Sequence, residues 1–166
     1  MLYRNILLVC LMAFFVYGCG SFFGDSYEDD VANDREILNE IIKENPILDS
    51  AVNAGHYFLP YSSESGRITG ELNLAELGLN DSNFHLPKSV SKFRIVKTLL
   101  FASNEFTGLP SGIKEKNWEK VVAWFNRICN PSSETVAYLD KKMEGYGGPY
   151  WRDSQRCSDS IPGISQ

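Results

Sequence analysis

The sequence is poor in the residues and motifs on which most enzymes depend. It has only two histidines, His56 and His85, and both stand in turn-like contexts. None of the motifs G-x-S-x-G, H-E-x-x-H, G-x-G-x-x-G or the P-loop occurs. The glycine-rich stretch at 145–148 follows a predicted helix rather than a strand, so it is better explained as a helix end. We therefore expect a protein that is not an enzyme and has no cofactor or metal site.

Positive charge is also scarce. The chain has 16 Lys and Arg against 21 Asp and Glu, which gives a net charge of −5 at pH 7. The basic residues form no stripe along the sequence. Nucleic acids and anionic lipids are recognised largely through their phosphates by basic surfaces. The composition therefore argues against a nucleic-acid partner and against membrane attachment by charge.

Long hydrophobic runs are missing except at the start, where the run Ile6–Val16 follows Arg4. This run is too short to span a bilayer and has the length of the apolar region of a signal peptide. The residues at 16–19, VYGC, are similar to the lipobox of bacterial lipoproteins. This resemblance implies a signal peptide at 1–18 and acylation of Cys19, for example with palmitate. The alternative is ordinary signal-peptidase cleavage, which would leave Cys19 as a free thiol.

The region after Cys19 predicts a tether and then a helical cap. Residues 19–32 include four acids near their end and predict a solvated, acylated tether. Residues 33–61 predict an N-terminal cap, in which Asn33 or Asp34 begins a helix that stops at Asn45. Its apolar stripe is typical of a helix that packs against a core and consists of Ile37, Leu38, Ile41 and Ile42.

The stretch at 96–110, VKTLLFASNEFTGLP, fits the pattern L-x-x-L-x-L-x-x-N-x-L. Leu99 and Phe101 are two residues apart, so on a strand they point to the same face. Asn104 is expected to turn the chain and to bond backbone groups that would otherwise be buried without partners. The pattern recurs, forward at Trp118, Val121, Ala123, Asn126 and Ile128, and backward at Leu72, Leu74, Leu77 and Leu79.

These copies resemble the bacterial leucine-rich-repeat proteins with short LP-x-x-I repeats, over residues 34–157. The resemblance implies an α+β fold, a short solenoid of about three repeats at 62–128 with parallel strands. Each such unit needs neighbours on which to stack, and the ends need caps. Here the caps would be an N-terminal and a C-terminal helix.

Residues 129–166 are similar to the C-terminal cap of the same family. Ser132 or Ser133 can cap a helix that runs to Met143. Cys129 and Cys157 are the cysteines that remain after Cys19 and the signal peptide. Because an exported chain meets oxidising conditions, we expect them to form a disulfide. A zinc site is disfavoured because no histidine lies near them.

Residues between the inward positions of the repeats should face outward from the concave side of the sheet. Apolar residues in a row on such a face are typical of a binding site. The alternative is that the C-terminal cap folds over them, with Tyr150 and Trp151 as covers. The candidate partner-binding residues are Thr98, Leu100, Lys120, Val122, Trp124 and Phe125.

The sequence therefore predicts an outer-membrane lipoprotein of the bacterial cell envelope, on the periplasmic or the surface face, whose repeats bind a protein or peptide. The first alternative is a structural module of the envelope without a specific ligand. A weaker alternative is a hydrolase built on a repeat scaffold.

Overall fold

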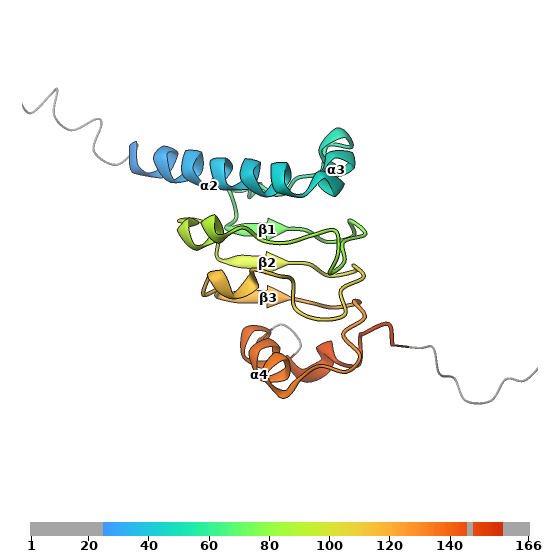
Figure 1. Ribbon diagram of the computed structural model, residues 1–166. Coiled ribbons are helices and arrows are strands. Elements are labelled where there is room, and N and C mark those ends of the chain that lie inside the picture. The colour runs from blue at the N-terminus through green and yellow to red at the C-terminus, as the bar shows by residue number, and fades with distance from the viewer. Residues whose placement is uncertain (1–24, 146–147, 158–166) are drawn as a thin grey trace, which may run out of the picture.

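The computed structural model describes residues 25–145 and 148–157, which form helices around one open, parallel, three-stranded sheet (Figure 1). The strands are short and lie in sequence order, β1-β2-β3. Their bounds are β1 Glu71–Asn73, β2 Thr98–Leu100 and β3 Lys120–Val122. The helices are α2 Asp25–Glu44, η1 Pro46–Leu48, α3 Asp49–Asn53, η2 Lys88–Lys92, η3 Ile113–Glu115, α4 Ser133–Lys142 and η4 Gly148–Trp151.

The three central residues of the strands lie beside one another in register. Leu72 pairs with Leu99, and Leu99 pairs with Val121. All three side chains are fully buried. Because side chains alternate along a strand, the residue two places later in each copy points to the same interior. Leu74, Phe101 and Ala123 are accordingly buried as well.

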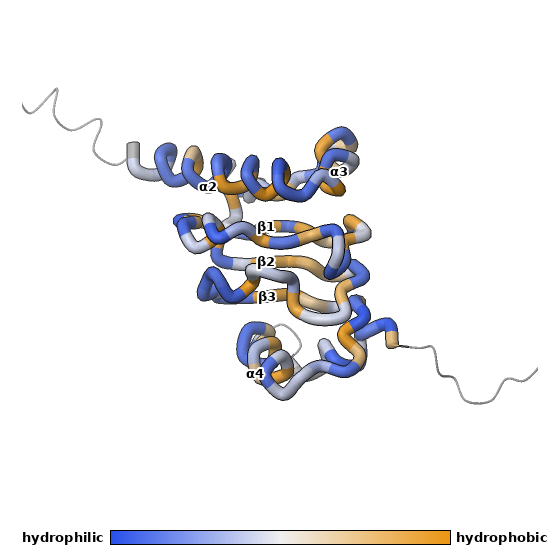
Figure 2. Tube along the Cα trace, viewed as in Figure 1, coloured by the Kyte–Doolittle hydropathy of each residue, from blue (hydrophilic) through white to orange (hydrophobic). Residues whose placement is uncertain are grey.

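Helix α2 begins at Asp25, eight residues before the expected start at 33, so the tether prediction for 19–32 is wrong for residues 25–32. Tyr27 and Val31 extend the apolar stripe of the helix backwards, and Val31 is buried. The acids of this segment suit the first turns of a helix, where the helix dipole favours negative charge. Figure 2 shows that the apolar side of α2 faces the sheet.

Asp34 does not begin this helix but lies within it, fully buried. Its carboxylate accepts hydrogen bonds from the backbone N–H groups of Arg94, Ile95 and Val96 at 2.8–2.9 Å. These groups precede β2 and would otherwise be buried without partners. Asn45, at the end of α2, makes a second such attachment, because its amide bonds the backbone N–H and C=O of His85. The N-terminal helix is thus fixed to the sheet region by two buried polar side chains.

The free edge of β1 is covered by the segment that follows α3. The N–H of Asn73 donates to the carbonyl of Phe58 at 2.8 Å, and the N–H of Thr69 donates to the carbonyl of Pro60 at 2.9 Å. Covering an edge strand removes unpaired backbone groups that would invite another chain to add to the sheet.

The C-terminal region lies on the other side, next to β3 (Figure 1). Ser132, one of the two serines that the sequence offers as a cap, caps α4 through its hydroxyl, which accepts from the N–H of Thr135. The expected disulfide between Cys129 and Cys157 is present, with the two Cα atoms 5.3 Å apart. Within the described part of the chain, none of the helices has the length and apolar character needed to cross a membrane.

Candidate binding surface

The outward positions of the strands form rows across the sheet. Strand register places Leu100 between Asn73 and Val122, and Thr98 between Glu71 and Lys120. The fold therefore brings together the four strand residues that the sequence suggests for binding. Trp124 and Phe125 follow β3 after one intervening residue, Ala123.

The exposure of these residues differs from the expected continuous apolar face. Leu100 and Trp124 are partly buried, whereas Phe125 is 50% exposed. Val122 is only 6% exposed, so its expected position as a solvent-facing side chain is wrong. It lies on the strand next to α4 and does not belong to the main core cluster. Packing between elements, rather than strand alternation, decides the burial of Val122.

The two aromatic residues that could cover this face, Tyr150 and Trp151, differ in burial. Trp151 is fully buried in the core, where its indole N–H donates to Asp140 Oδ1 at 2.8 Å. Tyr150 is 71% exposed. The exposure of Tyr150 does not support the alternative in which this ring covers the face.

Phe125 has an unusual backbone conformation, with φ of +56°. Two other residues without the freedom of glycine share it, Glu76 at +62° and Ser103 at +56°. All three occupy the same place in successive copies of the pattern, after the strand. A bulky aromatic residue at positive φ is a genuine outlier, and the left-handed conformation costs an L-residue about 1–2 kcal/mol. Phe125 thus combines backbone strain with an exposed apolar ring.

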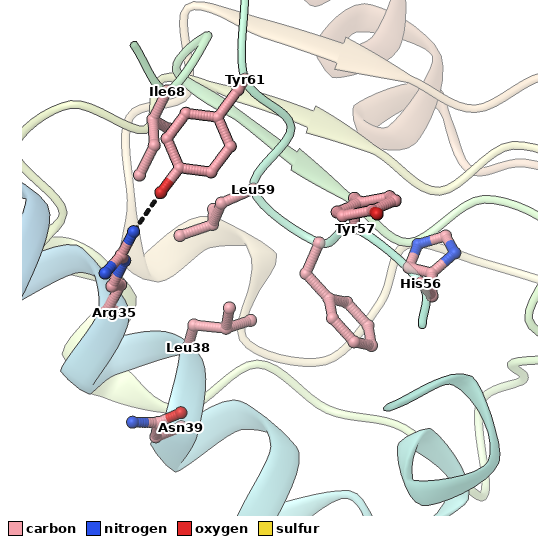
Figure 3. Close-up of a pocket in the computed structure, with 9 residues that line it drawn as sticks. Arg35, Leu38, Asn39, His56, Tyr57, Leu59, Tyr61 and Ile68 are labelled. Carbon is pink, nitrogen blue, oxygen red and sulfur yellow. Dashed lines mark hydrogen bonds between the residues drawn. The ribbon is translucent and has the colours of Figure 1, made fainter. Parts of the chain in front are cut away.

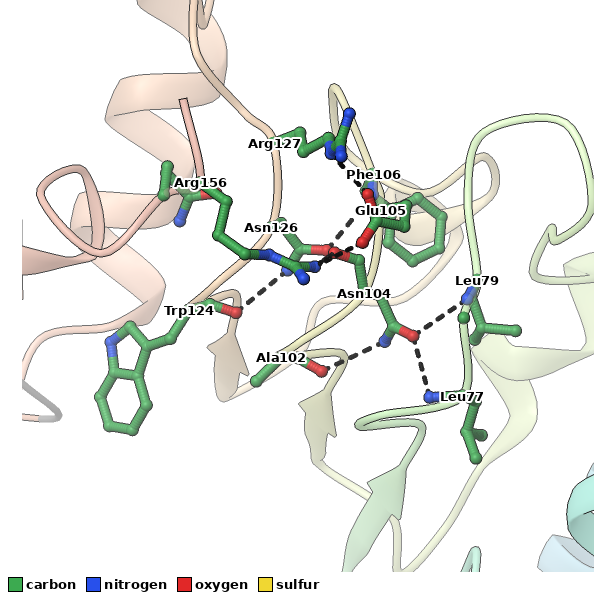
Figure 4. A network of polar contacts seen from close by, with 12 residues as sticks. Leu77, Leu79, Ala102, Asn104, Glu105, Phe106, Trp124, Asn126, Arg127 and Arg156 are labelled. Atoms are coloured by element: carbon green, nitrogen blue, oxygen red, sulfur yellow. Dashed lines mark hydrogen bonds and ion pairs between the residues drawn. The ribbon is translucent and has the colours of Figure 1, made fainter. Parts of the chain in front are cut away.

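Buried amides position the backbone behind this surface (Figure 4). Asn104 accepts from the N–H groups of Leu77 and Leu79 and donates to the carbonyl of Leu74 at 2.7 Å. Asn126 donates to the carbonyls of Phe101, Ala123 and Trp124 at 3.0–3.3 Å. Both asparagines are fully buried and fulfil the role expected of them.

Gln155 continues this arrangement after the last copy. Its Oε1 accepts from the N–H of Ile128 at 3.2 Å, and its Nε2 donates to the carbonyls of Ala123 and Trp151. Nothing in the local sequence around Gln155 marks it for this role, because its partners lie far away along the chain.

An exposed group of charges borders the surface at the turns (Figure 4). Glu105 pairs with Arg127 at 2.5 Å and with Arg156 at 2.8 Å, and Arg156 also donates to the carbonyl of Asn104. Exposed ion pairs contribute little to stability on their own. They do connect the turn after β2 to the C-terminal segment.

Burial shifts the pKa values of three groups in the described part of the chain. Burial raises the pKa of Tyr138 to about 12, and its buried hydroxyl has no hydrogen-bond partner in the described part of the chain. Burial lowers the pKa values of Lys116 and Lys142. Among residues 25–145 and 148–157, no group of three or more His, Cys, Asp or Glu is placed to hold a metal ion.

Two cavities lie at the opposite end of the molecule, and neither Leu100 nor Trp124 lines them. The first, of about 300 Å³, lies between α2 and the segment at 56–61 (Figure 3). The second, of about 280 Å³, is lined by Tyr57, Pro60 and Tyr61. Sequence reasoning did not single out these residues for binding; the cluster of aromatic residues at 57–61 was the available signal.

Cys19 lies outside the described residues, so its acylation stays a prediction. No protein-family model matches the chain, and neither a curated protein nor a solved structure is significantly similar to it.

Proposed function

We propose that this protein is a lipoprotein of the bacterial cell envelope that is anchored through Cys19 and binds a protein or peptide segment outside the cytoplasm. The proposed binding surface consists of Leu100, Trp124 and Phe125, with Thr98 and Lys120 at one side. Three short strands offer enough area for a peptide or a single loop of a partner rather than for a large globular face.

We also propose that the sheet and its turns are leucine-rich repeats stacked as a short solenoid. The in-register row of Leu72, Leu99 and Val121 supports this. So do the equivalent hydrogen bonds of Asn104 and Asn126, each of which joins its own turn to the preceding copy. In such an array each repeat contacts only its neighbours, so the ends need covers, and α2 and α4 lie at the two ends.

The observation that carries the binding proposal is Phe125. Its ring is half exposed, and its backbone has a conformation that glycine or asparagine adopts at lower cost. The conformation opposes folding, and the exposed half of the ring gains nothing from burial. A residue with these two features is a candidate for a role in recognition, and aromatic residues dominate binding energy at interfaces.

The burial of Val122 favours the second candidate, a structural module whose concave face takes no ligand. Because Val122 is buried, the middle of the proposed surface lacks one of its expected apolar residues. The two candidates differ in what Trp124 and Phe125 do, and therefore they can be separated by experiment.

Cross-linking and affinity capture from intact envelopes tests the proposal, with the wild-type chain compared with Trp124→Ala and Phe125→Ser. Binding predicts that the same captured protein is reduced at least tenfold by both variants. Tyr150→Ala is the control, because it removes an aromatic ring that is even more exposed and belongs to another element. If all four chains capture the same proteins in equal amounts, the structural module is the correct candidate.

A further inference from the structure

A cleft with aromatic walls lies between α2 and the segment that covers the edge of β1 (Figure 3). Leu38, Leu59 and Ile68 form its apolar part, and the last two are buried. Tyr57 and Tyr61 stand at its mouth, 75% and 51% exposed. These two rings also line the second cavity, so the two hollows adjoin the same pair of tyrosines. A hollow of about 300 Å³ is large enough for one or two side chains of a ligand.

The backbone beneath the cleft is held firmly. His56 Nε2 lies 3.0 Å from the carbonyl of Asn73, and its ring contacts Phe58 edge-to-face. Tyr61 pairs with Ile68 through an antiparallel bridge. The tyrosine rings therefore project from a segment that is fixed to β1, so a ligand would meet a preformed surface.

Arg35 places a guanidinium group at this cleft, where it donates to the hydroxyl of Tyr61. No carboxylate in the described ranges pairs with Arg35. Its neighbours three and four places away on α2 are uncharged. Four other arginines do pair with an acid, namely Arg94, Arg127, Arg152 and Arg156.

Arg67, which precedes the cleft residue Ile68 in the chain, carries a second guanidinium group. It lies 4.8 Å from the centre of the Tyr27 ring, and the hydroxyl of Tyr27 accepts from the N–H of Ile68. The chain has a net charge of −5, so two guanidinium groups without a carboxylate partner in the described ranges make this region unusually positive. The charge at the cleft is complementary to an anionic group.

We propose that this cleft is a second docking site, for an extended peptide that carries an aspartate or glutamate next to an apolar residue. The apolar side chain enters the hollow between Leu38 and Leu59, and the carboxylate pairs with Arg35 in place of the Tyr61 hydroxyl. Exchange of a neutral phenol for a carboxylate strengthens the interaction, since a carboxylate adds an opposite charge and can accept two parallel hydrogen bonds from the guanidinium group. This site is separate from the Leu100, Trp124 and Phe125 surface and extends the proposed function.

Selection of random seven-residue peptides displayed on phage, with the full chain in detergent, tests this site. The expected peptides share an acidic residue within two places of Leu, Ile, Phe or Pro. One such peptide and its counterpart with the acid replaced by the corresponding amide are then measured by calorimetry. The acidic peptide should bind at least tenfold more tightly than the amide peptide.

Variants of the cleft residues, compared with variants elsewhere, decide whether the peptides bind in the cleft. Arg35→Gln should make the two peptides bind equally, whereas Arg94→Gln should leave the tenfold ratio unchanged. Tyr57→Ala should weaken both peptides at least fivefold, whereas Tyr150→Ala should not. Trp124→Ala should have no effect, which separates this site from the first surface. No enriched peptide, or a tenfold ratio that survives Arg35→Gln, would overturn the proposal.

Discussion

Asn126 donates a hydrogen bond from its side-chain amide to the carbonyl of Phe101, 25 residues earlier, at 3.0 Å. This bond joins the turn after β3 to the end of β2. Asn104 makes the equivalent bond to the carbonyl of Leu74, 30 residues earlier. Both bonds are buried, so the protein depends on them to satisfy backbone carbonyls that water does not reach.

Asn126→Ala should lower the free energy of unfolding by about 2–4 kcal/mol, because the carbonyls of Phe101, Ala123 and Trp124 and the N–H of Phe106 lose a buried partner. Urea unfolding followed by circular dichroism measures this. Asn39→Ala, at an exposed position on α2, is the matched control and should change the value by less than about 0.5 kcal/mol. An equally small change for Asn126→Ala would show that the amide is dispensable.

The double variant Cys129→Ser with Cys157→Ser should lower the free energy of unfolding by about 3–4 kcal/mol. The bridge spans a sequence separation of 28, and in the chain-entropy model a loop of this size restricts the unfolded chain by that amount. Thermal unfolding with and without a reducing agent provides the check. The reducing agent should destabilise the wild-type chain and leave the double variant unchanged. If the reducing agent destabilised both chains to the same extent, its effect would not come from this disulfide.

Tyr138→Phe should leave stability at pH 7 unchanged or raise it, because the buried hydroxyl has no partner in the described part of the chain. The pKa of Tyr138 is raised to about 12 by burial, against about 10 for an exposed tyrosine. Because burial disfavours the ionised phenol, the folded state loses stability as the pH rises from the unfolded pKa through the folded pKa.

The wild-type chain should therefore lose more stability than Tyr138→Phe between about pH 10 and pH 12. Urea midpoints across this range measure the difference. Tyr57→Phe is the control, since it removes the hydroxyl of a tyrosine that is 75% exposed. Parallel profiles for wild type and Tyr138→Phe would contradict the burial of this hydroxyl.

Cys19→Ala should abolish the incorporation of labelled palmitate into the chain and release it from the membrane fraction. The reason is that stable anchoring needs more than one acyl chain, and each buried methylene contributes about 0.8 kcal/mol. Cys129→Ser tests whether labelling depends on any other cysteine and should keep the label. Persistent labelling of Cys19→Ala would reject the lipid anchor.

The periodic part of the fold was predictable from the sequence because its determinants are local and repeated. Leu99, Phe101 and Asn104 fix the strand and the turn through their spacing, and the same spacing recurs at Val121, Ala123 and Asn126. The residue that caps the C-terminal helix, Ser132, stands directly before that helix in the sequence. The disulfide was predicted from the expected export of the chain and from the small number of remaining cysteines.

The rest was not predictable because it depends on partners far away in the sequence. Asp34 looks like a helix cap, yet its carboxylate binds N–H groups 60–62 residues later. Gln155 has no local pattern and bonds residues 27 and 32 positions earlier. Val122 alternates outward on its strand but is buried, next to α4. Long-range packing therefore decides both how the ends are attached and how much of the candidate surface stays exposed.

The free energy of unfolding of Phe125→Asn is the most direct test of the claim that Phe125 serves recognition rather than folding. Asparagine tolerates the left-handed conformation found at this position, so relief of strain should offset the loss of a half-exposed ring. The account predicts a value that is unchanged or raised by up to about 1 kcal/mol. A loss of more than about 1.5 kcal/mol, as expected for a ring that packs in the core, would contradict it.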